Sequence, residues 1–480
     1  MTSSMQLRRC TKIGTSCVRL DITSEYTKFM SKYLSFFLFF CIGLSPTSRA
    51  QTDSGSVSLH VFDIDATPPV GSYLTYDRMT HTWDMGLRAR GVVLTGAGKP
   101  IVLCSVDWIG IANEGQDEFK RVLAQAAGTV PERVEVHTVH QHDAPTCDFG
   151  SESLLLSKGM DPINYEGTFA RKLLGILDSA VRASMQHPTP ITHIGLGAAD
   201  VQEVASNRRI LDANGKATIT RYSGTSNPEI RAYPEGLIDP EVSLISFWNE
   251  DKPVAVLSYY AVHPQSYYRT GTANPDFPGV ARFLRQLEVP DALHIHFNGA
   301  GGDITAGKYN DGSKENRGLL AQRLAAGMKE AWENTKKRPL RAADIGWAAE
   351  SIELPISPYA IQLEKELADH DAIYLANNVY KLVLYKRQLQ GKYIQLSCLK
   401  LGPARILHLP GEPFIAFQLA AKKMRPDLFV ALAGYGDYAP GYIGTAAAYQ
   451  EGGYEAGPAS GVTADAESKV LAVMEKLLNE

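Results

Sequence analysis

The residue pattern with the clearest chemical meaning in this sequence is a pair of histidines separated by one residue. His140 and His142 close a strand-like run that begins at Arg133. In a β-strand, side chains two positions apart point to the same face, so both imidazoles could converge on one metal ion or one substrate atom. This geometry suits a metal-dependent hydrolase. The alternative is that two of the 12 histidines simply lie close together on a solvated strand end.

Three further segments each place a polar side chain at the end of an apolar run. One run ends at His263, directly before a proline that would end strand pairing. Another leads from His408 into a Pro-Gly turn that projects the carboxylate of Glu412. The third segment, residues 434–445, is rich in glycine and aromatic residues and contains Tyr442. Each segment taken alone is more often structural than functional.

Taken together and in order, these segments resemble the catalytic domain of the neutral (non-lysosomal) ceramidases, which are zinc amidases. His140-Gln-His142-Asp-Ala-Pro145 is similar to the family's His-Thr-His-Ser-Gly-Pro motif, and Ala261-Val-His263-Pro264 is similar to its Ala-Val-His-Pro motif. Other similar motifs are Asn207-Arg208, Asp239-Pro-Glu241, Gly302-Asp-Ile-Thr305, Pro410-Gly-Glu412 and the tail segment from Tyr442 to Tyr454-Glu-Ala456. The resemblance runs from about residue 57 to the C-terminus. Its specificity lies in the combination, because no single motif is distinctive.

The resemblance implies a zinc ion and a set of residues around it. The implied zinc ligands are His140, His263, Glu412 and Tyr442, and the implied substrate-facing residues are His142, Arg208 and Tyr454. Imidazole, carboxylate and phenolate are all acceptable donors to Zn²⁺, and an open position lowers the pKa of a bound water to about 7. His142 would pass a proton to the leaving amine, since its ordinary pKa is about 6.5. Arg208 and Tyr454 would stabilise the oxyanion.

The function implied by the resemblance is that of an exported zinc-dependent amidohydrolase. Zinc-bound water would attack the carbonyl of a linear N-acyl amide. The substrate would be a small-molecule N-acyl amide or a lipid such as a sphingolipid. The expected partners are this substrate and, at most transiently, a membrane surface, with no stable protein partner.

The sequence departs from the family at two places that concern the substrate. Residues 144–148, Ala-Pro-Thr-Cys-Asp, replace a glycine-rich loop of the family with a bulkier and acidic wall. Asp143 and Asp148 would favour a cationic or bulky amine portion, so ceramide is expected to be a poor substrate. The chain also ends about 25 residues after Ala456, so the family's C-terminal β-sandwich domain is expected to be absent.

Other functional classes fit the sequence less well. Residues 302–308 have the spacing of a phosphate-binding loop, but Tyr309 stands where a Ser or Thr would hold Mg²⁺, which disfavours nucleotide hydrolysis. A non-catalytic ligand-binding protein that keeps the fold is the main alternative, and the presence of all four implied ligands argues against it. A barrel amidohydrolase with a His-x-His motif would need regular βα repeats, which the sequence does not show.

The elements that must position these residues are strands and helices in alternation. Predicted strands cover residues 101–111, 134–136, 242–248, 254–263, 293–297 and 404–409. Predicted helices cover residues 117–127, 316–336, 361–387 and 464–478, the last with Thr463 as N-cap. The pattern predicts an α+β fold of mixed β-sheets flanked by helices, like the neutral ceramidase catalytic domain. Residues 51–480 are predicted to form this one domain.

The N-terminal region reads as a targeting segment. Residues 30–50 have a charged start, a short apolar run and a small-residue cleavage site near Ala50, which is typical of a signal peptide. The apolar run is shorter than the roughly 20 residues that span a bilayer. Residues 1–29 precede the better initiator Met30 and are predicted to be a mis-assigned upstream start. The protein is therefore expected to be exported to the periplasm or outside the cell.

Charge and cysteine content exclude two further classes. Residues 1–50 carry seven basic and two acidic side chains, so residues 51–480 carry a net charge of −9 rather than the −4 of the whole chain. This charge argues against nucleic acid as a partner. Three cysteines remain, Cys104, Cys147 and Cys398, without the paired spacing of a disulfide framework.

Overall fold

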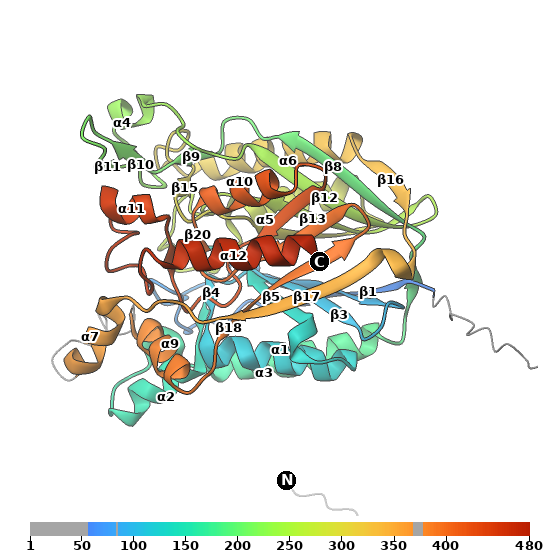
Figure 1. Ribbon diagram of the computed structural model, residues 1–480, viewed down its shortest axis with the longest axis horizontal. Coiled ribbons are helices and arrows are strands. Elements are labelled where there is room, and N and C mark those ends of the chain that lie inside the picture. Colours follow the sequence, from blue (N-terminus) through green and yellow to red (C-terminus); the bar gives the residue numbers. More distant parts are fainter. Residues whose placement is uncertain (1–55, 83–84, 368–377) are drawn as a thin grey trace, which may run out of the picture. The chain divides into compact units, whose positions relative to one another are not determined.

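A computed structural model describes residues 56–82, 85–367 and 378–480 (Figure 1). The predicted upstream segment 1–29 and the predicted signal peptide 30–50 lie outside these residues. The chain from Asp53 to Glu480 forms one compact unit. Among the described helices, none has both the length and the apolar character that crossing a bilayer requires.

Three mixed β-sheets form the framework of this unit. The first has the strand order β5 (Val134–Thr138), β3 (Ile101–Val106), β2 (Arg88–Thr95), β1 (Ser58–Asp65), β7 (Thr189–Pro190). The second has the order β14 (Leu293–Asn298), β13 (Lys252–Tyr260), β12 (Glu241–Asn249), β8 (His193–Asp200), β16 (Lys336–Pro339). The third has the order β17 (Ile345–Ile352), β18 (Ile394–Leu401), β19 (Ala404–His408), β21 (Phe429–Ala433).

Each sheet has one parallel strand pair at one edge, and all its other pairs are antiparallel. The parallel pairs are β3–β5, β13–β14 and β19–β21. Parallel neighbours need a crossover, and a helix lies in each connection: α1 (Asn113–Ala127), α5 (Asp276–Glu288) and α10 (Ile415–Met424). β14 contacts β3 and β5, and β13 contacts β21. The three parallel edges therefore lie side by side.

The remaining elements complete the chain. The other helices are α2 (Phe149–Ser157), α3 (Thr168–Ser184), α4 (Pro228–Ala232), α6 (Glu315–Glu333), α7 (Pro358–Glu366), α9 (Val379–Leu389), α11 (Ala446–Glu451) and α12 (Ala466–Asn479). The short strands are β4 (Gly110–Ile111), β6 (Thr146–Cys147), β9 (Ser206–Asn207), β10 (Arg209–Leu211), β11 (Ala217–Thr220), β15 (Ile304–Thr305), β20 (Glu412–Pro413) and β22 (Tyr442–Ile443).

The sheets share a central apolar core, and the helices cover their outer faces. Leu103, Leu257 and Ile406, one from each sheet, belong to the same buried cluster. Helices α1 and α3 pack on the first sheet, α5 and α6 on the second, and α10 and α12 on the third (Figure 1). The amphipathic pattern of these helices provides the apolar face that each sheet requires. The predicted α+β class, with mixed sheets flanked by helices, is confirmed.

Several element boundaries differ from the predictions. The helix predicted over residues 361–387 is two helices, α7 and α9, with undescribed residues between them. The predicted cap Thr463 is wrong, because Asp465 is the N-cap of α12 and makes no side-chain capping bond.

The cysteines Cys104, Cys147 and Cys398 are all free and buried.

Candidate metal centre

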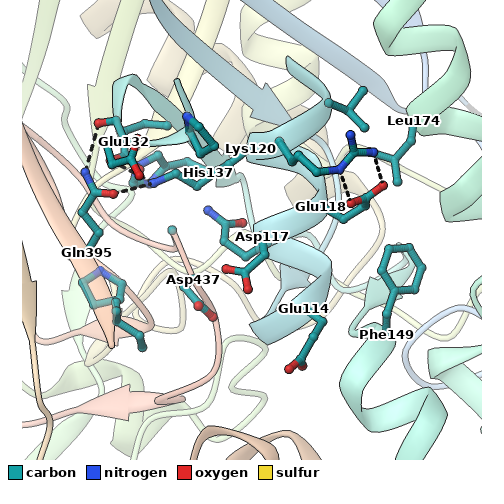
Figure 2. Close-up of a pocket in the computed structure, with 18 of the residues that line it drawn as sticks. Glu114, Asp117, Glu118, Lys120, Glu132, His137, Phe149, Leu174, Gln395 and Asp437 are labelled. Atoms are coloured by element: carbon teal, nitrogen blue, oxygen red, sulfur yellow. Dashed lines mark hydrogen bonds and ion pairs between the residues drawn. The ribbon is translucent and has the colours of Figure 1, made fainter. Parts of the chain in front are cut away.

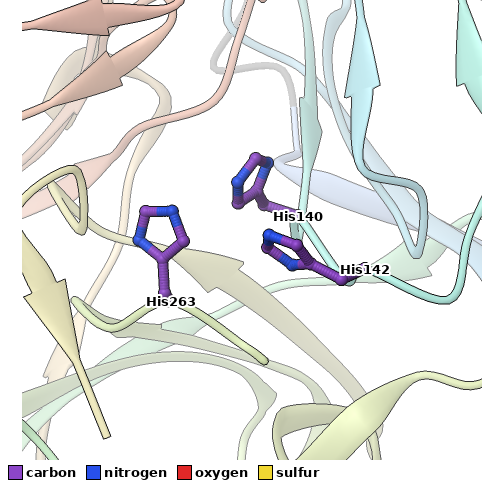
Figure 3. A group of neighbouring side chains, drawn as sticks. All are labelled: His140, His142 and His263. Carbon is purple, nitrogen blue, oxygen red and sulfur yellow. The ribbon is translucent and has the colours of Figure 1, made fainter. Parts of the chain in front are cut away.

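The predicted site residues lie where the three parallel strand pairs end. His140 follows β5, His263 follows β13 and Glu412 follows β19. The carboxyl ends of parallel strands form the edge at which ligands bind in such sheets. Because the parallel edges lie side by side, this arrangement brings together side chains that are far apart in the sequence. Figure 3 shows the imidazoles of His140, His142 and His263 pointing toward one another.

The two histidines of the first motif converge for a different reason from the one predicted. Strand β5 ends at Thr138, so neither histidine lies in it, and strand alternation does not place them. Instead, His140 has a left-handed backbone with φ of 72°. This turn sets the rings of His140 and His142 4.9 Å apart and nearly perpendicular, at 82°. The prediction of a shared strand face is therefore wrong, although the two side chains do meet.

The tautomers of His140 and His263 are fixed by backbone carbonyl groups. Nδ1 of His140 donates to the oxygen of Ile109 at 2.7 Å, and Nδ1 of His263 donates to the oxygen of Gly301 at 2.7 Å. A carbonyl oxygen can only accept, so the proton of each neutral ring is on Nδ1 and Nε2 presents a lone pair. This outer hydrogen bond is the usual way in which proteins orient a metal-binding imidazole.

Both Nε2 atoms face one carboxylate oxygen. Oε2 of Glu412 lies 3.3 Å from Nε2 of His140 and 3.0 Å from Nε2 of His263. When both rings are neutral, with their protons on Nδ1, three lone pairs face one another at this point. In a tetrahedral zinc site with bonds near 2.0–2.1 Å, neighbouring donor atoms are about 3.3 Å apart. The two distances from Oε2 to the Nε2 atoms therefore match the spacing of ligands around one cation.

The neighbouring charges and burial set the charge of Glu412 and His263 at neutral pH. Burial, aided by Arg208, lowers the pKa of His263 to about 4. Burial alone would raise the pKa of the Glu412 carboxyl, but His140 and His263 outweigh burial and hold it well below its usual range. At neutral pH the centre therefore combines an ionised carboxylate with a neutral His263 imidazole, a donor set that attracts a divalent cation.

His142 lies beside this cluster with a free ring nitrogen. Within the described residues, His140, His142 and His263 form a group of side chains that could hold a metal ion, with donor atoms that all lie within 4.8 Å of one another. Burial, followed by the neighbouring His140 and His263, holds the pKa of His142 well below its ordinary value. Its buried Nδ1 has no hydrogen-bond partner. The ring is therefore neutral, and no described residue engages its Nδ1.

The remaining predicted residues form a second group next to the donors. The Tyr442 hydroxyl lies 3.5 Å from Nε2 of His263. Nη1 of Arg208 donates to the Tyr442 hydroxyl at 3.2 Å and to the Tyr454 hydroxyl. Burial raises the pKa of Tyr442 well above its ordinary value. The structure thus brings all seven predicted site residues into one cluster.

Two tyrosines of the glycine-rich loop also support the centre. The Tyr438 hydroxyl donates to Oε1 of Glu412 at 2.7 Å, which leaves Oε2 for the centre. The ring of Tyr435 stacks on His140, with centroids 4.5 Å apart and planes at 25°. The sequence indicated this loop as a whole through its aromatic and glycine content, but it gave no signal that these two tyrosines support the donors.

The predicted acidic wall at Ala144–Asp148 is not available to a substrate. Asp148 is fully buried, and its carboxylate caps α2 by accepting from the first backbone N–H groups of that helix. The carboxylate of Asp143 accepts from the backbone N–H of Arg269 and from the hydroxyl of Thr270, both at 2.7 Å. Because hydrogen bonds within the protein occupy both carboxylates, the prediction that they favour a cationic amine is wrong.

A large cavity lies away from this centre. Its volume is about 1090 Å³, and Lys120, His137, Gln395 and Asp437 are among its lining residues (Figure 2). None of the seven predicted site residues lines it.

Lys308, from the segment with phosphate-loop spacing, donates from Nζ to the backbone oxygens of Arg231 and Tyr233. Its role is therefore structural.

Comparison with known proteins identifies the fold. No protein-family model and no curated protein sequence matches the chain. The crystal structure of neutral ceramidase from Pseudomonas aeruginosa matches with a TM-score of 0.63 and 15% sequence identity, over 88% of this chain and 74% of that chain. A structure of a ceramidase complexed with C2 matches with the same TM-score and coverage, at 16% identity. The fold is that of neutral ceramidase.

The neutral ceramidase fold confirms the resemblance that the ordered motifs predicted. The match covers most of the chain, as the motifs did. At a sequence identity of 15%, the match shows that the fold is similar and does not show that the chemistry is the same. The roles of the seven residues therefore stay predictions, and the geometry of this chain must support them.

Proposed function

We propose that the protein is a zinc-dependent hydrolase that cleaves the amide bond of an N-acyl substrate. The observation that carries this proposal is the convergence of Nε2 of His140, Nε2 of His263 and Oε2 of Glu412 with their lone pairs facing one another. The matching solved structures are named as ceramidases, which supports including lipid amides in the proposed substrate class.

Zinc fits this donor set better than the other common divalent cations. Two imidazole nitrogens and one carboxylate oxygen, with Tyr442 as a fourth donor, match the ligands that Zn²⁺ accepts. Mg²⁺ and Ca²⁺ prefer all-oxygen sites. When bound, zinc supplies a Lewis acid that polarises the amide carbonyl and lowers the pKa of water to about 7.

His142 is placed to move the proton that amide hydrolysis requires. Its ring is neutral and buried next to the donors, and its Nδ1 has no hydrogen-bond partner. The imidazole can therefore accept a proton from the attacking water and deliver it to the leaving nitrogen. Without this transfer the leaving group would be an amide anion, which is far less stable than an amine.

Arg208 and Tyr454 are placed to stabilise the oxyanion. Arg208 is buried, and its Nε lies 3.9 Å from Oε1 of Glu455. Its Nη2 has no hydrogen-bond partner within the described residues, so this donor is free for a substrate oxygen. Donors that are already oriented in a water-poor site need little reorganisation when charge develops on that oxygen. Loss of one such donor typically costs about 3–4 kcal/mol of transition-state stabilisation.

The proposal is tested by metal analysis of the purified protein together with hydrolysis of a panel of N-acyl amides. We expect about one zinc per chain and release of free amine that stops when a chelator removes the metal. A protein that binds these amides but holds no metal and releases no amine would instead be a non-catalytic binding protein.

Export belongs to the same proposal and rests on the signal-like pattern of residues 30–50. We expect the mature N-terminus to lie near Ala50 and the protein to be found in the periplasm or outside the cell. N-terminal sequencing of the protein from each cell fraction measures both. A cytoplasmic protein that retains residues 30–50 would contradict export and leave the amidase proposal untouched.

A further inference from the structure

Two exposed tyrosines contact the ring of His142. The ring of Tyr76 stacks on His142 with centroids 5.8 Å apart, and the ring of Tyr268 lies 5.9 Å from it at a steep angle. The two tyrosine rings also contact each other at 5.0 Å. Tyr76 is 41% exposed and Tyr268 is 38% exposed, so both belong to the surface that surrounds the centre.

A single cation lies over this aromatic pair. The guanidinium carbon of Arg269 is 5.5 Å from the ring centre of Tyr76 and 5.4 Å from that of Tyr268. The side chain is exposed, and it forms no ion pair with any residue that the structure describes. Stacking on tyrosine faces holds a guanidinium in place while leaving its N–H groups free to bind an anion.

Two aspartate carboxylates hold the backbone around Arg269 in an unusual conformation. Arg269 has a left-handed backbone with φ of 62°. Its N–H donates to Oδ1 of Asp143, and Oδ2 of Asp143 accepts from Thr270. The N–H of Gly271 donates to Oδ2 of Asp77 at 2.9 Å. Both nearby acidic residues therefore stabilise the loop that presents the arginine, and the free charge at this position is positive.

The position of His142 determines which part of a substrate meets this cation. In the proposed function, on which this inference rests, His142 delivers a proton to the leaving nitrogen. Whatever is attached to that nitrogen must then lie next to His142, against Tyr76, Tyr268 and Arg269. A free guanidinium with two aromatic faces fits an amine portion that carries a carboxylate and an apolar side chain.

We propose that the enzyme acts on N-acyl amino acids, with Arg269 binding the carboxylate of the amino-acid portion. Hydrolysis breaks the amide C–N bond, forms a C–O bond to the oxygen of water and moves one proton from water to the nitrogen. The products are a fatty acid and a free amino acid. Ceramide carries no carboxylate at this position and cannot use Arg269 in this way.

The test compares substrates that differ only in the carboxylate. N-dodecanoyl-phenylalanine and N-dodecanoyl-phenethylamine share the acyl chain and the aromatic ring, and only the first has a carboxylate. We expect kcat/KM of the zinc enzyme to be at least about tenfold higher for the first, a difference of about 1.4 kcal/mol. Arg269→Gln should remove this preference by lowering kcat/KM for the acid alone. Arg78→Gln is the matched control, because Arg78 is another exposed arginine stacked on a tyrosine, Tyr73.

A binding measurement separates this inference from the proposed function. Calorimetry with free phenylalanine and free phenethylamine should show a preference for phenylalanine that Arg269→Gln removes, whether or not the protein hydrolyses amides. Equal kcat/KM for the two substrates, or an equal loss for both in Arg269→Gln, would overturn the role of Arg269. A kcat/KM for ceramide more than tenfold higher than that for the N-acyl amino acid would also overturn the role of Arg269. Absence of zinc and of all hydrolysis would refute the proposed function instead.

Discussion

At the scale of single residues, the centre depends on which nitrogen of each histidine carries the proton. The carbonyl groups of Ile109 and Gly301 place the protons of His140 and His263 on Nδ1. His142 has no such carbonyl contact at Nδ1, which is buried and without a partner. This difference in hydrogen bonding distinguishes the two side chains that we propose as metal ligands from the one that we propose as the proton carrier.

The different roles of these histidines predict different mutant behaviour. His140→Ala should lose zinc and activity together, because it removes a donor. His142→Ala should keep its zinc while kcat falls about 10²–10⁴-fold, the usual loss for a missing general acid–base group. Metal content by atomic emission and steady-state kinetics on the same samples measure both. Equal loss of metal in the two variants would make His142 a ligand.

The sequence identified the donor residues but not the groups that orient them. His140, His263 and Glu412 were predicted because imidazole and carboxylate groups at the ends of apolar runs fit metal chemistry. The carbonyl acceptors and the stacked ring of Tyr435 were not predicted, because any residue supplies a carbonyl and a tyrosine ring stacks only where tertiary structure places it. The opposite error occurred at Asp143, whose carboxylate was assigned to the substrate although the folded loop occupies it.

At the scale of elements, apolar runs located the strands, but their pairing was not predictable. The runs at β12, β13, β14 and β19 were predicted to within about three residues of their observed bounds, whereas the run predicted over residues 101–111 is divided into β3 and the short β4. Which strands pair, and which pairs are parallel, depends on contacts between distant segments that no local pattern encodes. The left-handed backbone of His140 was not predictable for a similar reason, because only the packing of the folded loop requires it.

The loop after β14 places two elements of the centre in close contact, and this contact tolerates no side chain. A Cβ on Gly302 would lie 2.4 Å from the backbone oxygen of Glu412. Gly302→Ala should therefore displace Glu412 and weaken zinc affinity by about 10–100-fold, as loss of supporting contacts does in other metal sites. Gly318→Ala in α6 is the control, since a Cβ there meets no atom within 4 Å. Zinc titration with a competing chelator measures both variants, and equal affinities would contradict the prediction.

A buried ion pair joins the first sheet to a helix of the second. Asp107, which follows β3, accepts two hydrogen bonds from Arg282 of α5, at 2.7 and 2.6 Å. Both side chains are at least 96% buried. Asp107→Asn should cost about 3–5 kcal/mol of unfolding free energy, because it leaves the Arg282 charge buried without its partner. Asp178→Asn, which breaks a partly exposed ion pair with Arg182, should cost about 1 kcal/mol or less. Urea unfolding measures the loss of unfolding free energy in each variant. Equal losses in the two variants would contradict this account.

The ion pair between Asp107 and Arg282 makes the free energy of unfolding depend on pH in the acidic range. Burial would raise the pKa of Asp107, but Arg282 outweighs burial and lowers it below its ordinary value of 3.8. A lowered folded-state pKa means that the stabilisation is fully present above the unfolded-state pKa and is lost as pH falls through the folded-state value. The difference in stability between the parent protein and Asp107→Asn should therefore shrink below about pH 4.

At the scale of the whole molecule, the centre exists only when the three sheets have assembled. His140, His263 and Glu412 come from the ends of strands in three different sheets, and no single sheet or helix pair holds more than part of the donor set. The sheets also share one apolar core, to which each contributes. Formation of the centre and formation of the core are therefore the same event, and a bound ion adds a further link between the sheets.

This coupling predicts that zinc stabilises the whole fold. An ion that binds the folded state alone adds RT ln(1 + [L]/Kd), which is about 2.7 kcal/mol at a free concentration of 100 times Kd. With an unfolding entropy of about 2.1 cal/mol/K per residue, a unit of this size should gain about 3 °C in its melting temperature. Calorimetry of the metal-free protein with and without zinc measures the shift. His140→Ala should show little of it, because its donor set is incomplete. An equal shift in the melting temperature of His140→Ala would mean that zinc binds elsewhere. The ion can link the three sheets only when each sheet contributes its donor side chain.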